Sequence, residues 1–434
     1  MQSIQEVLKE RQPTQSTPTV SAVFDDGSIL ELVYDPVICE THFAYAHKSG
    51  IWEFEDKHRI NAMTELVPYS PHNNLIKNEI VLLPSTPCEY GTEAELLAEI
   101  KTFVHRYVDV SPLYEDIACY YVLFSWVYDG FNELPYLRVR GDPGCGKTRF
   151  LLTVGSLCYK PIFASGASTV SPLFRLLEVF RGTLIIDESD FRYSDEKAEM
   201  VKILNNGNVR GFPVLRSESN GKGEFNPHAY HVFGPKILAS RGDFEDLALE
   251  SRFLSEEMGG DLRPDVPINL PANHKAEALA LRNKLLLFRF RNYHKRRPMA
   301  EMTDESLEPR LNQIFNPLFS IVEDPQVRDR LRSVLLECQR DLILERGLKV
   351  EGSVLEVIQE LQAISDRRLS VKEITDRFID IHGEEFQRRV SAKWIGSILR
   401  KKLHLRTEKS HGSYVIADSE LPKLEKLFRR YGLT

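Results

Sequence analysis

The chain has 434 residues, more than a single hydrophobic core usually serves, so we expect about two to four domains. Its 42% hydrophobic and 27% charged residues are ordinary for a globular protein, and no apolar run is long enough for a membrane span, so we expect no membrane partner. The net charge of −7 excludes a uniformly basic nucleic-acid coat, although it allows a local basic surface.

Residues 1–110 are predicted to form a mainly β domain with a helical end. Short runs of strand-forming residues fill residues 21–90, and Gly, Asn and Pro separate them. Between Thr92 and Val110 the apolar residues recur at helical spacing instead. The first residues lack the basic and apolar segments of a signal peptide, so we expect a cytoplasmic protein.

A glycine-rich loop follows the next short apolar run and precedes a segment suited to a helix. It matches G-x-x-x-x-G-K-[ST] in full and reads Gly141, Asp142, Pro143, Gly144, Cys145, Gly146, Lys147 and Thr148. In such loops the glycines let backbone N–H groups surround phosphate oxygens, and the helix N-terminus adds partial positive charge. Lys147 would reach the β- and γ-phosphates, and the Thr148 hydroxyl would hold Mg²⁺. The motif therefore predicts a site for ATP and Mg²⁺.

The segment Thr183–Glu188 reads as a buried strand that ends in two acids. In phosphate-loop ATPases an acid at this strand end holds Mg²⁺, and a second acid can deprotonate the attacking water. We assign Asp187 to the metal and Glu188 to the general base. This pair predicts ATP hydrolysis rather than simple nucleotide binding, and solvated acids at a strand end are the alternative.

The segment Arg210–Glu224 reads as a strand, an Asn-Gly turn and a second strand. Lys222 at its tip and Arg216 on its flank are suited to contacts with DNA phosphates. The alternative is an ordinary exposed hairpin.

The next strand, Lys236–Arg241, is expected to end beside the γ-phosphate, where a polar side chain can sense the nucleotide. Ser240 is the candidate and Arg241 the alternative, and either residue could simply belong to a turn. Arg252 lies in the segment Leu249–Phe253 beyond this strand and suits an arginine finger that reaches the γ-phosphate of a neighbouring subunit. An exposed arginine at a helix end is the alternative.

Alternating strands and helices across residues 111–350 predict an α/β domain, with a parallel sheet covered by helices on both faces. Its ligands should bind at the carboxyl ends of the strands. The clearest later helices are Ala276–Phe290 and Pro309–Ile321. The basic and aromatic run Arg289–Arg297 reads as a solvated helix end, with a nucleic-acid patch as the alternative.

Residues 351–434 are predicted to form a separate domain of three helices and a hairpin. The third helix, Ser391–Leu403, and the hairpin Leu405–Ile416 carry an excess of basic residues. This arrangement resembles a winged helix whose third helix reads DNA. The candidate DNA contacts are Lys393, Arg400, Lys401 and Arg406. A structural role or a contact with another protein is the alternative.

Together these motifs resemble those of the AAA+ ATPases, most closely the minichromosome-maintenance helicases and their relatives on mobile genetic elements. Gly141–Gly144 is similar to the opening of that family's phosphate loop, Ile186–Glu188 to its acidic strand end, and Leu249–Phe253 to its finger motif. The resemblance covers residues 115–325 and extends loosely to the C-terminal domain. It implies a helical lid with a second sensor arginine, for which Arg310 is the candidate and Arg282 the alternative.

The chain departs from that family at three points. It offers Ser240 or Arg241 where the family has Asn at the first sensor. Its phosphate loop ends Gly146-Lys147-Thr148 rather than Ala-Lys-Ser. Its six cysteines are scattered, without the zinc-binding set usual in the family's N-terminal domain and without the spacing of a disulfide framework. The resemblance therefore implies a divergent enzyme of a phage, plasmid or genomic island.

The resemblance also implies a function. We expect an ATP-driven DNA helicase or translocase that works as a homo-oligomeric ring, a hexamer, on single-stranded or forked DNA, with replication proteins as partners. In such a ring the hairpin with Arg216 and Lys222 would move along the central channel. The alternative is a non-translocating AAA+ loader or regulator that remodels a replication or transposition partner. A nucleotide-switched DNA-binding scaffold is a third reading.

Overall fold

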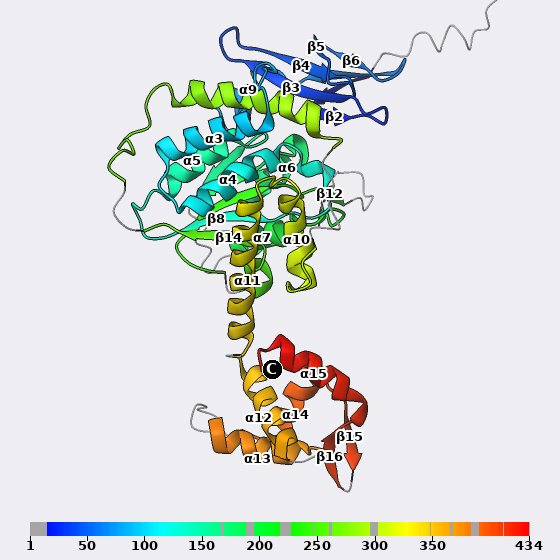
Figure 1. The fold of residues 1–434 in the computed structure, drawn as a ribbon. Helices are drawn as coiled ribbons and strands as arrows, with labels where there is room; N and C mark the ends of the chain where they lie inside the picture. The colour runs from blue at the N-terminus through cyan, green and yellow to red at the C-terminus, as the bar shows by residue number, and fades with distance from the viewer. Residues whose placement is uncertain are drawn as a thin grey trace, which may run out of the picture. The chain divides into compact units, whose positions relative to one another are not determined.

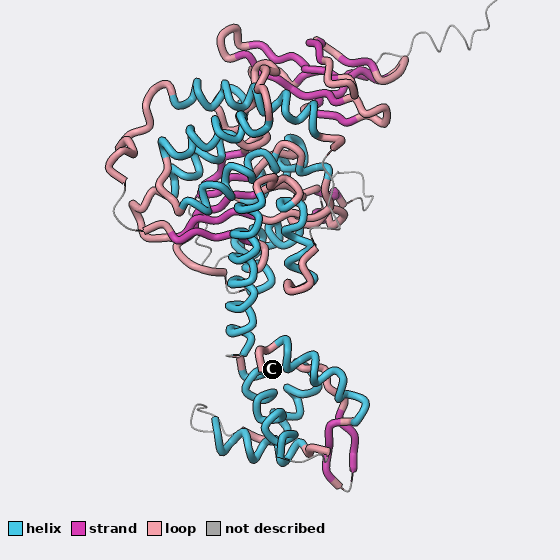
Figure 2. Tube along the Cα trace, in the orientation of Figure 1, coloured by secondary structure: helices cyan, strands magenta, loops and turns pink. Residues whose placement is uncertain are grey.

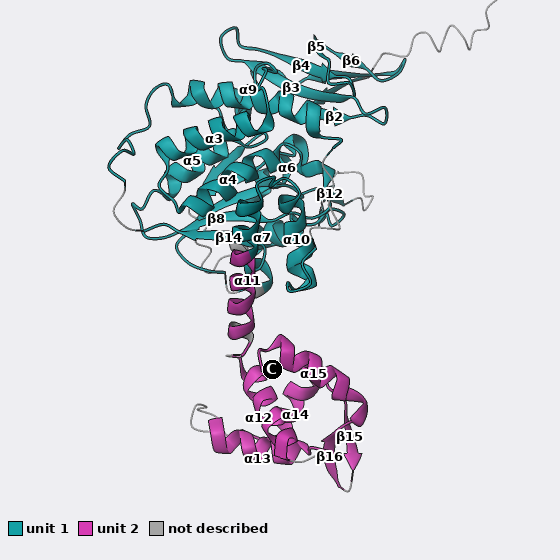
Figure 3. Ribbon diagram, in the orientation of Figure 1, with its two compact units in different colours: residues 1–332 teal, residues 333–434 magenta. Residues whose placement is uncertain are grey.

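The computed structural model describes residues 15–165, 169–187, 195–217, 227–244, 246–259, 263–295, 303–347, 349–364, 368–382, 390–410 and 412–433. The chain divides into two compact units, residues 1–332 and 333–434 (Figure 3). The division falls within helix α11 (Pro325–Gly347). The first turns of α11 belong to the first unit, where Arg330 pairs with Asp116 at 3.2 Å.

The first unit opens with two small sheets. An antiparallel sheet has the strand order β2-β3-β4-β5, and a second sheet has the order β1-β7-β6, in which β1 is parallel to β7. The strands are β1 (Gln15–Thr19), β2 (Ser21–Val23), β3 (Ile29–Asp35), β4 (Glu40–Ala46), β5 (Trp52–Glu55), β6 (His58–Arg59) and β7 (Thr64–Pro68). Strands thus fill much of the region where short β runs were expected.

Three helices connect these sheets to the rest of the unit. After the short α2 (Asn74–Lys77), helix α3 (Glu93–Tyr107) begins with a capping box. In that box Thr92 Oγ1 accepts a hydrogen bond from the Glu95 backbone N–H at 3.2 Å, and the Glu95 carboxylate accepts one from the Thr92 N–H at 2.8 Å. Helix α4 (Pro112–Ser125) has proline in its first turn and is buried along nearly its whole length, so it forms the centre of the unit.

A five-stranded, all-parallel sheet with the order β14-β8-β13-β10-β9 is the main element of the first unit (Figures 1 and 2). Its strands are β8 (Tyr136–Arg140), β9 (Ile162–Ser165), β10 (Leu184–Asp187), β13 (Lys236–Ser240) and β14 (Phe253–Glu257). Strand β13 lies between β8 and β10, and all five of its residues are buried. The carboxyl ends of β8, β13 and β10 therefore meet at one edge of the sheet, as expected for an α/β domain.

Helices connect and cover these strands. The elements are η1 (Tyr128–Gly130), α5 (Lys147–Leu157), α6 (Val170–Phe180), α7 (Asp195–Asn206), α8 (Leu247–Glu250), α9 (His274–Asn292) and α10 (Pro309–Phe319). Helix α5 packs against α3, α4 and α9, and α6 packs against α7 (Figure 1). A short antiparallel pair, β11 (Val214–Arg216) with β12 (His228–Tyr230), lies between α7 and β13 in the sequence.

A cluster of buried charges joins the N-terminal sheet to the helices around the parallel sheet. Glu31 on β3 accepts a hydrogen bond from Arg289 Nε at 2.7 Å, and its second carboxylate oxygen lies 2.7 Å from Lys160 Nζ. The guanidinium of Arg289 also bonds both carboxylate oxygens of Asp129, and Tyr159 donates to Glu31. Arg289 is 1% exposed, so the expectation of a solvated helix end was wrong at this position. Its acidic partners lie far away in the sequence, where helical spacing gives no hint of them.

In the part of the second unit that the structure describes, four helices and a hairpin follow α11. They are α12 (Val350–Ile364), α13 (Val371–His382), α14 (Ala392–Ser397) with its π-helical continuation η4 (Ile398–Lys402), β15 (Thr407–Ser410), β16 (Ser413–Ile416), η5 (Asp418–Glu420) and α15 (Leu421–Arg430). Leu355, Phe378, Ile395 and Leu424 belong to its apolar core. Helix α15 was not expected from the sequence.

The helices expected from periodicity are present with shifted ends. The segment predicted as Ala276–Phe290 forms the longer α9, and the one predicted as Pro309–Ile321 ends earlier, at Phe319. Among the helices that the structure describes, none is both long and apolar enough to cross a membrane.

Candidate nucleotide-binding site

The predicted phosphate loop connects β8 directly to α5 at the carboxyl edge of the sheet. Gly141, Gly144 and Gly146 have φ values of 140°, 92° and 99°, a backbone region that side chains rarely adopt. At Gly141 there is also no room, because a Cβ atom would overlap the carbonyl oxygen of Met258 and approach Cys145 Sγ. The glycines therefore allow the tight turn by which the loop reaches the first turn of α5.

Two predicted site residues, Lys147 and Thr148, lie in the first turn of α5. Lys147 Nζ donates hydrogen bonds to the carbonyl oxygens of Gly141 at 2.6 Å and Asp142 at 2.8 Å. The Thr148 hydroxyl donates to Oδ2 of Asp187, the last residue of β10, at 2.7 Å. A hydroxyl and a carboxylate at one point are hard oxygen ligands of the type that Mg²⁺ prefers, so the donor set fits that ion. The structure thus brings Asp187 into contact with Thr148, a predicted site residue 39 positions earlier in the sequence and adjacent to Lys147.

The structure describes one of the two acids predicted at the end of β10. Asp187 is the last residue of the strand and pairs with Ser165 on β9. Glu188, the predicted general base, lies outside the described residues.

The first sensor position lies at the end of β13, between the strands that carry the loop and Asp187. Ser240 is 3% exposed and its hydroxyl donates to the Gly242 carbonyl at 3.0 Å. Arg241, the alternative, is exposed. The hydroxyl of Ser240 thus serves the turn that follows the strand, and the choice between these two residues remains a prediction.

A buried arginine next to the loop holds the segment that carries Arg252. Arg138 on β8 is 0% exposed and forms a two-pronged ion pair with Glu250 at the end of α8. Its guanidinium also contacts Asp243 beyond β13 at 3.2 Å and donates to Ser255 on β14 at 3.0 Å. Sequence reasoning missed Arg138, because an arginine inside an apolar strand shows no pattern of its own.

Arg252 and Arg310, the predicted finger and second sensor, lie close together. The guanidinium of Arg252 donates to Asn205 on α7, and Arg310 donates to the Ala248 carbonyl at 2.7 Å. Burial lowers the pKa of Arg252 and the positive charge of Arg310 lowers it further, while Tyr136 and the carboxylate of Asp246 act in the opposite direction. The hydrogen bonds of both arginines go to uncharged acceptors, an amide oxygen and a backbone carbonyl oxygen, and Asp246 is a nearby carboxylate that attracts Arg252.

The alternative second sensor, Arg282, has a structural position. It is 6% exposed within α9 and donates to the Ser156 carbonyl of α5 at 2.8 Å. Burial lowers its pKa to about 10. Its side chain fixes α9 against α5, which favours Arg310 as the residue that meets nucleotide.

The predicted DNA hairpin is described only at its base. Strands β11 and β12 form an antiparallel pair, but β12 (His228–Tyr230) lies beyond the predicted segment Arg210–Glu224, and Lys222 lies outside the described residues. Arg216 is engaged within the subunit: its guanidinium lies 4.0 Å from the centre of the Phe174 ring and 2.7 Å from the Glu199 carboxylate. Arg216 therefore fastens β11 to α6 and α7, a role that the sequence did not suggest.

The basic residues predicted in the second unit are all exposed. Lys393 lies on α14, Arg400 and Lys401 follow in η4, and Arg406 precedes β15. Arg400 also donates to Thr407 Oγ1 at 3.2 Å, which ties the third helix to the hairpin. Accessible cations on adjacent elements fit a phosphate backbone, and their contact with DNA remains a prediction.

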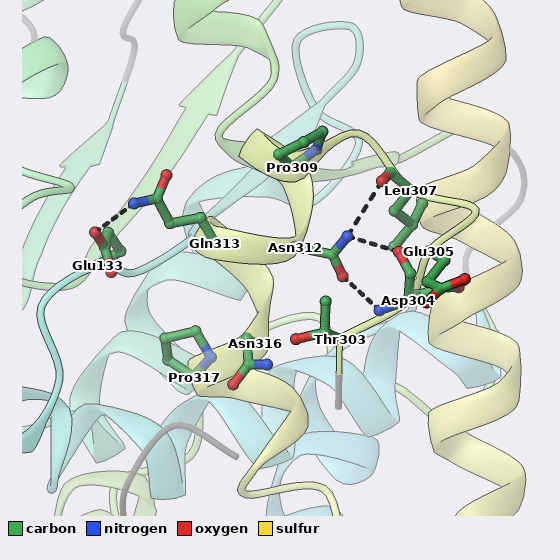
Figure 4. Close-up of a pocket in the computed structure, with 10 residues that line it drawn as sticks. All are labelled: Glu133, Thr303, Asp304, Glu305, Leu307, Pro309, Asn312, Gln313, Asn316 and Pro317. Atoms are coloured by element: carbon green, nitrogen blue, oxygen red, sulfur yellow. Dashed lines mark hydrogen bonds between the residues drawn. The ribbon is translucent and has the colours of Figure 1, made fainter. Parts of the chain in front are cut away.

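A cavity of about 800 Å³ lies beside α10, and the phosphate loop contributes none of its lining (Figure 4). Glu133, Asp304 and Glu305 line it, and Gln313 points to Glu133 and donates to it at 2.9 Å. Asn312 braces the segment opposite by donating to the Asp304 carbonyl at 2.7 Å. Because carboxylates repel phosphate, this cavity does not suit the nucleotide.

Comparison with solved structures finds matches of low sequence identity and low TM-score. No protein-family model and no curated protein matches the sequence. The C-terminal region of NrS-1 aligns over 89% of this chain and 95% of its own, at 13% identity and a TM-score of 0.38. The Orc1 protein of Aeropyrum pernix in complex with DNA aligns over 75% and 94%, at 16% identity and 0.23, and JCV helicase over 58% and 64%, at 10% identity and 0.25. At these scores none of the three assigns a family or a function to this chain.

Proposed function

We propose that the chain is an ATP hydrolase of the AAA+ type. The observation that carries this proposal is the 2.7 Å hydrogen bond between Thr148 and Asp187 beside Lys147. Lys147 would exchange its two carbonyl partners for phosphate oxygens, and Thr148 and Asp187 would hold Mg²⁺, which when bound neutralises charge on the phosphates. Glu188 would take the proton of the attacking water. Arg252, with Arg310 beside it, would stabilise the transition state in the site of a neighbouring subunit.

The test of hydrolysis uses two substitutions in the site. Lys147→Ala should abolish ATP turnover because it removes the phosphate clamp, while Glu188→Gln should bind ATP and fail to hydrolyse it. Lys202→Ala, which removes an exposed lysine on α7, is the control and should keep parental kcat. Steady-state ATPase assays and nucleotide-binding titrations distinguish these outcomes. Hydrolysis by Glu188→Gln at the parental rate would show that the base is another residue.

We further propose that hydrolysis drives a ring, a hexamer of this chain, along single-stranded or forked DNA during replication of a mobile element. The exposed cations of the second unit, read as a winged helix, support contact with DNA. The hairpin between β11 and β12, with Lys222 at its tip, would be the moving contact. The internal partners of Arg216 favour the alternative of a non-translocating loader or regulator, since they occupy one of the two cations expected to grip DNA.

A strand-displacement assay with both tail polarities separates these functions. A helicase unwinds one polarity in an ATP-dependent manner. A loader hydrolyses ATP without unwinding. If the chain is a nucleotide-switched scaffold, the Glu188→Gln variant should still function, because a scaffold does not need ATP hydrolysis.

A further inference from the structure

The partner of the Arg252 guanidinium is an uncharged amide. Asn205, near the end of α7, accepts its hydrogen bond, and no other side chain is recorded hydrogen-bonded to that guanidinium among the residues that the structure describes. Arg252 Nε is buried without a hydrogen-bond partner. An amide oxygen holds a guanidinium in place without cancelling its charge.

The nearby Arg138 shows what a charged partner does. It is fully buried, and Glu250 and Asp243 neutralise it, so it has no charge left to offer a ligand. Arg252 lies only two residues beyond Glu250, yet its partner is neutral. Arg138, which has a structural role, thus has carboxylate partners, whereas Arg252, the proposed finger, has an amide partner.

The orientation of the Asn205 amide is fixed from its other side. Asn205 Nδ2 donates to Asp246 Oδ2 at 3.3 Å, so the amide oxygen faces Arg252 and the nitrogen faces Asp246. Only this orientation satisfies both neighbours, since a guanidinium can only donate and a carboxylate can only accept. Asp246 thereby fixes the amide of Asn205, and its carboxylate also attracts the Arg252 guanidinium electrostatically.

We propose that Asn205 is the positioning residue of the Arg252 finger, which it orients while leaving the guanidinium charged. The proposal rests on the proposed function, in which Arg252 meets the γ-phosphate of a neighbouring subunit.

The test replaces the neutral amide of Asn205 with a charged carboxylate of nearly the same shape. Asn205→Asp in the full chain should pair with Arg252 and neutralise it, lowering the kcat of ATP hydrolysis by about tenfold or more, toward the value of Arg252→Ala, with the KM for ATP nearly unchanged. Asn206→Asp is the matched control, since the neighbouring Asn206 donates to the Lys202 carbonyl at 2.8 Å. It introduces the same charge one position along α7 and should keep parental kcat.

A second comparison separates positioning from a general structural effect. In the Arg252→Ala background, Asn205→Asp should cause no further loss, because its target is gone. Asn205→Ala, which adds no charge, should lower kcat less than Asn205→Asp. Parental kcat in Asn205→Asp alongside a defective Arg252→Ala, or an additional loss in the double variant, would overturn the role of Asn205. Parental kcat in Arg252→Ala would instead reject the finger, and with it any residue that positions it.

Discussion

Four arginines of the first unit differ in what their partners do with their charge. Arg138 and Arg289 bind carboxylates and are neutralised inside the protein. Arg282 binds backbone carbonyls and fixes one helix against another. Arg252 donates to the amide oxygen of Asn205, an uncharged partner, which fits its proposed role at a phosphate. The chemistry of the partner, rather than the arginine, indicates which of these residues can act on a phosphate.

The low pKa of the buried Lys160 leads to a prediction about how the stability of the protein depends on pH. Burial lowers its pKa to about 8, and the opposing attraction of Glu31 does not restore it to the 10.5 of an exposed lysine. Between these values the unfolded chain binds more protons than the folded one, so the contribution of Lys160 to the free energy of unfolding rises with pH across that window. Between about pH 7.5 and about pH 9.5, the Tm of the parent should rise relative to the Tm of Lys160→Met, by on the order of a few degrees.

Thermal melts of both proteins at the two pH values check this. The comparison with Lys160→Met removes the effect of the other groups that titrate in alkali. An equal pH dependence in the two proteins would mean that Lys160 has its ordinary pKa.

At the scale of elements, the phosphate loop depends on the close approach of β8 to the end of β14. Gly141→Ala should lose nucleotide binding and about 1–3 kcal/mol of stability, because its Cβ would overlap the Met258 carbonyl as well as occupy a strained backbone region. Gly144→Ala is the matched control: its φ is similarly positive, but no atom lies within 4 Å of the added Cβ. Nucleotide titrations and denaturant unfolding should therefore show a much larger effect at Gly141. Equal effects would show that backbone strain, and not space, decides the shape of the loop.

The hairpin makes a separate prediction. If Lys222 contacts a DNA phosphate as proposed, Lys222→Ala removes one such contact per subunit, so unwinding and DNA-stimulated ATP hydrolysis should fall while basal hydrolysis stays near the parental rate. The loss should shrink at high salt, where phosphate contacts are already screened. If Lys222→Ala unwinds DNA normally, the hairpin is an ordinary surface loop and the loader function gains support.

What could be predicted from the sequence depends on how local the determinants are. The phosphate loop and the acidic end of β10 are each encoded within a few consecutive residues, and α9 and α10 each show their pattern within one continuous segment. The sequence was therefore sufficient to predict these elements. Arg289, Arg138 and Asn205 were missed or misread because their partners lie on other elements. No spacing rule reports a partner that only the tertiary fold brings into contact.

At the scale of the whole molecule, the proposed ring makes the active site a shared one. Arg252→Ala and Lys147→Ala subunits should each be inactive alone, yet a mixture of the two should recover part of the ATPase activity. In mixed rings some interfaces pair an intact phosphate loop with an intact finger. Recovery is measured against the mixing ratio, after exchange of subunits has been verified with labelled protein. A mixture as inactive as its two components would argue for a site completed within one subunit.

The buried cluster of Glu31, Lys160, Arg289 and Asp129 determines where this protein can be cut. Removing the N-terminal sheet would take Glu31 away and leave two cations sharing one carboxylate in an apolar interior, a loss of the kind that costs several kcal/mol. The sheet is therefore no detachable module, although its fold looks like one. A chimaera that fuses the parallel-sheet part of this chain to a different N-terminal domain has to carry β3 along or replace Lys160 and Arg289 with apolar residues.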